Sequence, residues 1–206
     1  MASVVVGVTG GVAAFKAPIV VRECQRAGHD VRVAATLSSL DFVGRSTWEG
    51  ITSRPVAVDI AGEGRAEHVE LARVADLIIV VPATANTLAK LAAGFADDMV
   101  SLTVLASAAP VVVAPAMHSN MWLASATQAN VATLRRRGVH VIDPETGALE
   151  PFNFRHIQEH IPELKRLGHK TASISFDPPM DSSDIGPDSW AKIVRLIADN
   201  YDAYDG

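Results

Sequence analysis

The segment DLIIVVPATANTLAKLAAG, residues 76–94, is the most informative about the fold, because its pattern changes from that of a strand to that of a polar turn and then of a helix. Its first part is apolar and rich in β-branched residues, which is typical of a strand buried on both faces of a parallel sheet. The turn PATANT, residues 82–87, carries hydroxyl and amide side chains. The segment that follows has helical spacing, with Asn86 as a plausible N-cap. Residues 76–94 therefore predict a strand–turn–helix unit with polar groups where the strand ends.

Similar units occur along the chain on both sides of this stretch. Apolar, β-branched runs predict strands, and the segments between them have helical spacing. We expect strands at 3–8, 30–36, 54–60, 76–84, 110–117 and 139–143, and helices within 9–29, 38–51, 68–75, 86–94, 97–109 and 126–138. Strands and helices that alternate in this way imply right-handed crossovers. The pattern predicts an α/β fold with a doubly wound parallel sheet, in a three-layer α-β-α arrangement of the Rossmann or flavodoxin-like type.

Composition and charge exclude several classes of protein. The 206 residues suffice for one ordinary α/β domain, or for one domain with an appendage. Hydrophobic residues make up 49% and the formal net charge is −5, which fits a globular protein and argues against nucleic acid as the main partner. Cys24 is the single cysteine, so no disulfide framework and no cysteine metal cluster is expected. The sequence shows no signal peptide and no membrane span, and we expect a cytoplasmic protein.

Small or polar residues follow four of the expected strands. These segments are TGG (9–11), TLSS (36–39), PATANT (82–87) and PAMHSNMW (115–122). Ligands of doubly wound sheets bind beyond the carboxyl ends of the strands. The four segments are therefore the candidate binding site.

The glycine turn and the PATANT turn together favour a ligand that has a phosphate and a polar ring. Gly10 and Gly11 let the backbone approach an anion at a helix start. Taken alone, this turn is equally well explained as a tight connection, because it lacks the full G-x-G-x-x-G or P-loop spacing. Thr84, Asn86 and Thr87 add side-chain donors at a second helix start. A mononucleotide or a flavin fits these groups better than a metal ion, since no cluster of metal-ligating residues has ligand spacing.

Two histidines are candidates for chemistry. His68 precedes a helix and follows the glycine-containing segment 61–67, and His118 follows an expected strand. An exposed histidine at a helix start is usually a solvated residue, and nothing near His68 in the sequence makes it a catalytic base. The position of His118 at a strand end favours an active-site role more strongly.

Several motifs, taken in order and spacing over residues 3–143, carry a family resemblance. They are TGGVAAFK, TLSSLDFV, the helix start at His68, PATANTLAKLAAGFADD and PAMHSNMW. Together they resemble the flavin-containing cysteine decarboxylases, and within them the phosphopantothenoylcysteine decarboxylase branch. The resemblance implies FMN as the cofactor, bound in a cleft between the subunits of a homo-oligomer built from trimers. It also implies a small cysteine-containing substrate and a place in coenzyme A biosynthesis.

The resemblance assigns a role to each matching residue. His68 would be the catalytic base for the cysteine thiol, and His118 stands where the family has an asparagine that binds the substrate carboxylate. In the implied reaction, a hydride leaves the cysteine β-carbon for the flavin, and the resulting thioaldehyde accepts the electrons left when CO2 departs. The residues expected at the cofactor are Gly10, Gly11 and Val12 on the phosphate side, and Thr36, Ser38, Thr84, Ala85, Asn86, Thr87 and Ala116 along the flavin.

The chain departs from the family pattern at two places. His118 replaces the asparagine of P-x-M-N-x-x-M-W, and a histidine donates the same hydrogen bond. The coenzyme A branch also has a clamp cysteine that reprotonates the enethiolate, and no cysteine follows Cys24 in this chain. We therefore expect impaired decarboxylation of 4'-phosphopantothenoylcysteine. One alternative is oxidative decarboxylation of a peptidyl cysteine.

Residues 144–206 resemble the N-terminal region of cytoplasmic-type L-asparaginases. Their MDSSD stretch matches a substrate-binding loop of that family, but the family's catalytic threonines are absent, so asparagine hydrolysis is not expected. The expected organisation is a flavoprotein domain at 1–143 and an α-β-α segment at 144–206 that extends the same sheet. We interpret the chain as an engineered chimera of two α/β pieces. A second alternative is that such a chimera has no activity and is a monomer without flavin.

Overall fold

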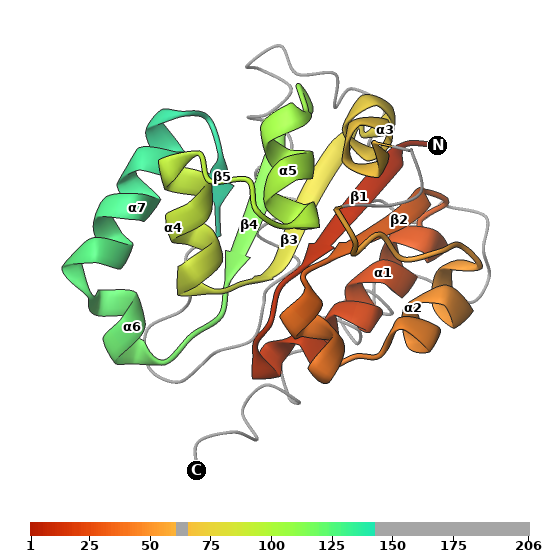
Figure 1. Ribbon diagram of the computed structural model, residues 1–206, viewed down its shortest axis with the longest axis horizontal. Helices are drawn as coiled ribbons and strands as arrows, with labels where there is room; N and C mark the ends of the chain where they lie inside the picture. Colours follow the sequence, from red (N-terminus) through yellow and green to blue (C-terminus); the bar gives the residue numbers. More distant parts are fainter. Residues whose placement is uncertain (61–65, 143–206) are drawn as a thin grey trace.

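The computed structural model describes residues 1–60 and 66–142, and a parallel sheet of five strands forms the centre of this part (Figure 1). The strand order is β2-β1-β3-β4-β5, and every neighbouring pair is parallel. The strands are β1 Ser3–Val8, β2 Asp30–Ala35, β3 Leu77–Ala83, β4 Val111–Pro115 and β5 His140–Val141. This order is that of the flavodoxin-like doubly wound folds, so the predicted fold class is confirmed.

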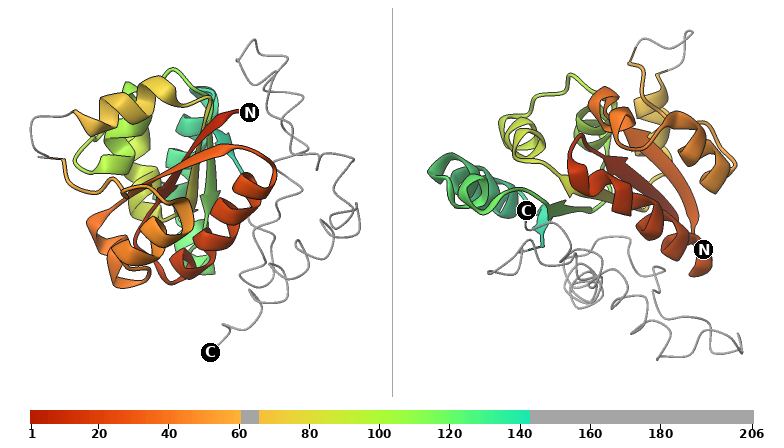
Figure 2. Two further views of the ribbon diagram at one scale, coloured as in Figure 1. Left: turned by 90° about the vertical axis from the view of Figure 1, so that its right-hand side faces the viewer. Right: turned by 90° about the horizontal axis from the view of Figure 1, so that it is seen from below.

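Helices connect the strands and lie on both faces of the sheet (Figure 2). They are the 3-10 helices η1 Val12–Lys16 and η2 Leu37–Asp41, and the α-helices α1 Ala17–Arg26, α2 Arg45–Thr52, α3 Glu67–Val74, α4 Ala85–Ala93, α5 Met99–Ala106, α6 Ser119–Leu123 and α7 Ser125–Arg136. Within the described part of the chain, none of these helices has the length and apolar character that crossing a membrane requires. The α-β-α segment expected at 144–206 lies outside the described residues.

Two expected elements differ from those in the structure. The helix expected at 38–51 is divided into η2 and α2, because the backbone is extended at Gly44, which is the N-cap of α2. The strand expected at 54–60 is reduced to one parallel bridge between Ala34 and Ala57. Pro55 precedes this bridge and has no N–H to donate to a longer ladder.

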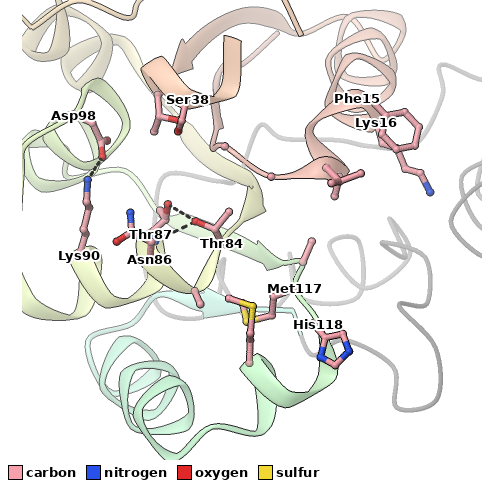
Figure 3. Close-up of a pocket in the computed structure, with 18 of the residues that line it drawn as sticks. Phe15, Lys16, Ser38, Thr84, Asn86, Thr87, Lys90, Asp98, Met117 and His118 are labelled. Atoms are coloured by element: carbon pink, nitrogen blue, oxygen red, sulfur yellow. Dashed lines mark hydrogen bonds and ion pairs between the residues drawn. The ribbon is translucent and has the colours of Figure 1, made fainter. Parts of the chain in front are cut away.

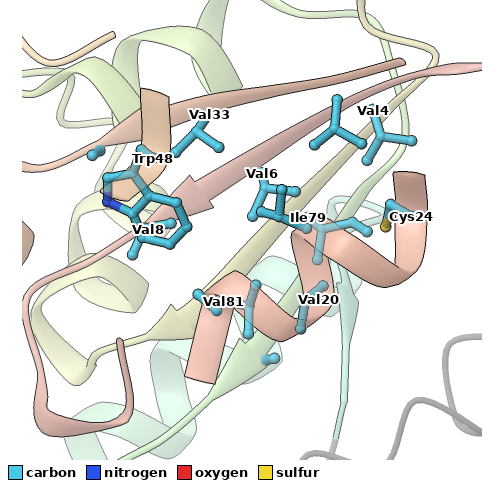
Figure 4. Packing of buried hydrophobic residues seen from close by; sticks show 14 of the residues in the cluster. Val4, Val6, Val8, Val20, Cys24, Val33, Trp48, Ile79 and Val81 are labelled. Atoms are coloured by element: carbon cyan, nitrogen blue, oxygen red, sulfur yellow. The ribbon is translucent and has the colours of Figure 1, made fainter. Parts of the chain in front are cut away.

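Alternate residues of the strands pack into two separate cores. Val4, Val6 and Val8 of β1 belong to one core, which Val20 of α1 and Trp48 of α2 help to close (Figure 4). Val5 of β1 belongs to the other core, together with residues of α4, α5 and α7. Successive side chains of a strand point to opposite faces, so both faces of the sheet are buried. This explains why β1, β3 and β4 are almost wholly apolar, whereas β2, at the end of the strand order, carries Asp30 and Arg32 at half-buried positions.

A topological switch point lies between β1 and β3. The connection that follows β1 leads to β2 on one side, and the connections that follow β3 lead to β4 and β5 on the other side. In such sheets a crevice opens beyond the carboxyl ends of the two strands at the switch point. The glycine turn follows β1 and the PATANT turn follows β3, so both turns meet at this crevice.

Candidate functional site

A cavity of about 820 Å³ lies at this switch point (Figure 3). Its volume is within the range of about 300–1,000 Å³ that is common for small-molecule sites. The glycine turn, η1, the start of η2, the start of α4 and the segment between β4 and α6 form its walls. The sheet order therefore gathers the polar strand ends into one concave site.

All residues that the sequence predicts at the cofactor line this one cavity. They are Gly10, Gly11, Val12, Thr36, Ser38, Thr84, Ala85, Asn86, Thr87 and Ala116. His118, the expected substrate-binding residue, lines it as well. Met117, expected with Ala116 at the floor of the flavin site, lines it too. The lining residues that sequence reasoning missed are Ala13, Phe15, Lys16, Leu37, Lys90, Asp98 and Met121. Helical spacing was a usable signal for Lys90, because it lies one turn after Asn86 on the same face of α4.

The glycine turn touches two walls of the cavity at once. A Cβ atom at Gly10 would lie 2.2 Å from Ser38 Oγ and 3.0 Å from the backbone carbonyl carbon of Ser38. A Cβ atom at Gly11 would lie 3.3 Å from Thr84 Cγ2. The approach of Gly10 to η2 is therefore possible only without a side chain.

Thr84 begins α4 and organises its first turn. Its Oγ1 accepts a hydrogen bond from the backbone N–H of Thr87 at 3.3 Å, and the two hydroxyl oxygens lie 3.0 Å apart. The N-cap is therefore Thr84 and not Asn86, because the backbone is extended at Thr84 as an N-cap requires, whereas Asn86 is already helical. The first backbone N–H groups of a helix lack partners inside the helix, so this turn suits an anion or a polar ring.

An ion-pair cluster closes the wall between α4 and α5. Lys90 Nζ lies 2.9 Å from Asp98 Oδ2 (Figure 3). The same Nζ atom lies 2.7 Å from Asp97 Oδ1. The hydrogen bond with Asp97, and then that with Asp98, raise the pKa of Lys90. Burial by itself raises the pKa of Asp98, but hydrogen bonds from the Ser101 backbone N–H and from Lys90 outweigh burial and lower it. Asp98 is also the N-cap of α5, so the cluster joins the two helices.

His118 caps α6 and lines the cavity at the same time. Its Nδ1 accepts a hydrogen bond from the backbone N–H of Asn120 at 3.2 Å. A ring nitrogen that accepts a hydrogen bond carries no proton, so the neutral ring has its proton on Nε2. His118 therefore supplies a hydrogen-bond donor at the cavity wall, close to Met117 (Figure 3).

His68 does not belong to the wall of this cavity. It lies in the first turn of α3, and its buried Nδ1 has no hydrogen-bond partner among the residues that the structure describes. Exposed apolar side chains occur on α3 and on α5, which pack against each other: Val69 is 48% exposed and Leu105 is 62% exposed. The structure thus separates His68 from the other predicted site residues of the same chain.

Cys24 has no access to the cavity. It lies in α1, fully buried in the core. Burial, and after it the negative charge of Glu23, raise the pKa of the Cys24 thiol to about 12. Cys24 therefore stays protonated in the core and cannot replace a mobile clamp cysteine.

Comparisons with known proteins identify relatives over most of the chain. A family model described as "Flavoprotein" matches residues 1–166. The coenzyme A biosynthesis bifunctional protein CoaBC of Mycobacterium tuberculosis (strain H37Rv) is 52% identical over 147 residues, which cover 71% of this chain and 35% of that protein. CoaBC of Vibrio vulnificus (strain YJ016) is 35% identical over 195 residues, which cover 88% of this chain and 49% of that protein. The chain thus spans about a third to a half of the length of these relatives.

Among solved structures, the FMN-dependent cysteine decarboxylase SpaF is similar with a TM-score of 0.67 and 34% sequence identity. The match covers 71% of this chain and 86% of SpaF. The family match also passes residue 143, where the sequence resemblance ended, and continues to residue 166. These findings support the flavoprotein resemblance and give no support to an asparaginase-like segment.

Proposed function

The chain belongs to the Flavoprotein family, and from this premise we propose that it is an FMN-dependent decarboxylase of a cysteine-containing small molecule. A single observation carries the proposal: every residue predicted at the flavin lines the one cavity at the switch point. Phosphopantothenoylcysteine is the proposed substrate, because the motifs of residues 3–143 resemble that branch and CoaBC proteins are similar over 71% and 88% of the chain. We further propose that residues 1–143 form the active site and that the protein is cytoplasmic.

The chemistry of the cavity fits FMN. Gly10 has no side chain, and this lets the glycine turn lie against Ser38 at the edge of the cavity. Backbone N–H groups at a helix start suit a phosphate. Thr84 and Thr87 supply hydroxyl groups at the start of α4. Lys90 is engaged by two carboxylates, so the donors for a phosphate are backbone N–H groups and hydroxyls rather than this ammonium group.

The residues of this chain bind and orient, and the cofactor supplies the redox chemistry. When bound, FMN accepts two electrons from the cysteine side chain. The Nε2–H group of His118 would donate a hydrogen bond to the substrate carboxylate and hold it over the cavity. His68 would remove the proton of the thiol. Loss of CO2 then leaves an enethiolate. Return of the two electrons and protonation would give the aminoethanethiol, whereas protonation and release at this stage would give the enethiol.

A second candidate function is oxidative decarboxylation of a C-terminal peptidyl cysteine, with the enethiol as the final product. The burial of Cys24 favours this function, because Cys24 is the single cysteine of the chain and lies in the core within α1. No thiol of this chain then returns a proton to the enethiolate. Dioxygen would reoxidise the flavin after each turnover.

The location of His68 favours a catalytic cleft between subunits. In one chain His68 lies outside the cavity, and its Nδ1 has no partner among the described residues. A neighbouring subunit that covers the exposed Val69 and Leu105 would bury apolar surface on α3 and α5. The proposed homo-oligomer, built from trimers, would bring His68 of one subunit to the flavin of another.

Titration of the purified protein with FMN, with the mass followed by light scattering, tests these proposals together. We expect a yellow protein with the flavin absorbance band and the mass of an oligomer. Incubation with phosphopantothenoylcysteine, and separately with a peptide ending in cysteine, is expected to release CO2, and the product masses distinguish an aminoethanethiol from an enethiol. Protein that stays colourless and monomeric after incubation with FMN would contradict the proposal and favour a fold without activity.

Two substitutions at His118 test its proposed role. In His118→Asn the side chain keeps both an acceptor for the Asn120 N–H and a donor for a carboxylate, so we expect nearly unchanged kinetics. In His118→Asp the acceptor remains but the donor is replaced by a negative charge. Repulsion of the substrate carboxylate is expected to raise KM by about tenfold or more while FMN content stays the same. Equal KM values for the two variants would contradict a carboxylate contact at this position.

A further inference from the structure

Thr9 is a buried residue that contacts both sides of the switch point. It lies directly between the end of β1 and Gly10 and is 1% exposed. Its hydroxyl donates a hydrogen bond to the backbone carbonyl oxygen of Pro82 at 2.6 Å and accepts one from the backbone N–H of Thr84 at 3.2 Å. Thr9 does not appear in the described lining of the cavity, so no role in contacting a ligand accounts for these bonds.

The hydroxyl replaces backbone pairing where the sheet ladder stops. The parallel register between β1 and β3 ends at the pair Gly7 and Val80. Beyond it, Pro82 has no N–H group, so the chain cannot continue the ladder through this residue. A threonine hydroxyl both donates and accepts, and Thr9 uses the two functions on two different backbone groups of the β3 side.

This link connects the two walls on which the cavity depends. On one side Thr9 is followed by Gly10 and Gly11, which lie against Ser38 and Thr84. On the other side it holds the amide of Thr84, the N-cap that sets the first turn of α4. A shift of either wall would change the distance between the glycine turn and the start of α4.

We propose that Thr9 is a positioning residue for the flavin site, whose hydroxyl sets the spacing between the glycine turn and the first turn of α4. This inference rests on the proposed binding of FMN. Thr9 acts through Pro82 and Thr84 and touches neither cofactor nor substrate.

Thr9→Ser and Thr9→Ala form the decisive pair, because both lose the methyl group and only serine keeps the hydroxyl. We expect Thr9→Ser to bind FMN within about threefold of the wild-type Kd, and Thr9→Ala to bind about tenfold more weakly because two backbone groups lose their partner. The flavin absorbance band of Thr9→Ala is expected to differ from that of the wild type at saturating FMN. Equal FMN affinity of the two variants would overturn the proposal, whether both bind FMN as tightly as the wild type or both bind it about tenfold more weakly.

Thr103→Ala is the matched control. Thr103 is also 1% exposed, and its hydroxyl donates to the Met99 carbonyl oxygen at 2.7 Å within α5, away from the lining of the cavity. We expect this variant to lose thermal stability, as Thr9→Ala does, but to keep the wild-type FMN affinity and spectrum. If Thr103→Ala loses as much FMN affinity as Thr9→Ala, general destabilisation explains both results, and the proposed positioning role of Thr9 is contradicted. Wild-type protein is titrated first, and if it binds no FMN, the proposed function fails rather than the role of Thr9.

Discussion

Gly10→Ala is expected to weaken FMN binding strongly while the rest of the fold stays assembled. The added Cβ atom would lie 2.2 Å from Ser38 Oγ and 2.7 Å from Ser38 Cβ, so η2 must move away from the glycine turn. Overpacking of this kind typically costs about 1–3 kcal/mol of unfolding free energy. The same displacement separates two walls of the cavity, and we expect FMN affinity to fall by about a hundredfold or more. Thermal unfolding and an FMN titration measure the two effects.

Gly50→Ala controls for the general effect of replacing a glycine. Gly50 lies inside α2, and a Cβ atom there would meet nothing within 4 Å. Alanine is the better helix former, so this variant is expected to gain up to about 1 kcal/mol and to bind FMN normally. In Gly10→Ala combined with Ser38→Gly, the two shortest contacts disappear and the one to the Ser38 backbone carbon at 3.0 Å remains. This double variant should regain part of the lost stability. Wild-type stability and FMN affinity of Gly10→Ala alone would disprove the close approach of Gly10 to Ser38.

His68→Asn is expected to keep FMN but to lower CO2 release by about a hundredfold or more, as the removal of a general base commonly does. FMN binding should persist because His68 lies outside the lining of the cavity. Asparagine is similar in size and polar, so the first turn of α3 is preserved. Arg73→Gln, at the exposed end of the same helix, serves as the control with normal turnover expected. Normal turnover of His68→Asn would show that the base has been assigned wrongly.

Mixed oligomers test whether His68 acts on a neighbouring subunit. In His68→Asn the cavity is intact, whereas His118→Asp keeps His68 but has an impaired substrate site. If each active site combines the cavity of one subunit with His68 of another, coexpression of the two variants restores about one quarter of the sites. Activity well above that of either variant alone is the expected result. The assay uses substrate well below KM, where the raised KM lowers the rate of His118→Asp about tenfold. Mixed oligomers no more active than His118→Asp alone would place His68 and the flavin site in the same subunit.

The strands and the ligand-binding edge were predictable because they depend on local pattern. The apolar, β-branched runs at 3–8 and 76–84 are typical of strands buried on both faces, and parallel strands bring their carboxyl ends to one edge. Residues 54–60 have a similar pattern but form a single bridge. A longer strand also needs backbone N–H and C=O groups of a neighbouring strand to pair with, and the local pattern does not reveal these. The fold class therefore followed from the sequence, whereas the extent of each strand did not.

Site residues were predictable from the sequence where their role depends on the turn in which they lie. Gly10 and Thr84 stand at turns whose chemistry is visible in the sequence. Helical spacing could indicate that Lys90 faces the cavity, but not that it pairs with Asp98, and the bond of Thr9 to Pro82 likewise forms only in the folded chain. The cap at Thr84 was missed for a similar reason, since the backbone angles and not the residue type select it over Asn86.

The cluster of Lys90, Asp97 and Asp98 has a consequence for the response of the protein to acid and alkali. The pKa of Asp98 is lowered from its ordinary 3.8, so its contribution to stability is complete above that value and disappears only as the pH falls through the lower folded value. The pKa of Lys90 is raised from its ordinary 10.5, so its contribution is complete below that value and disappears only as the pH rises beyond it. Between these limits Lys90 and Asp98 both keep their charges, so the ion pair that joins α4 to α5 is expected to persist across this range of pH.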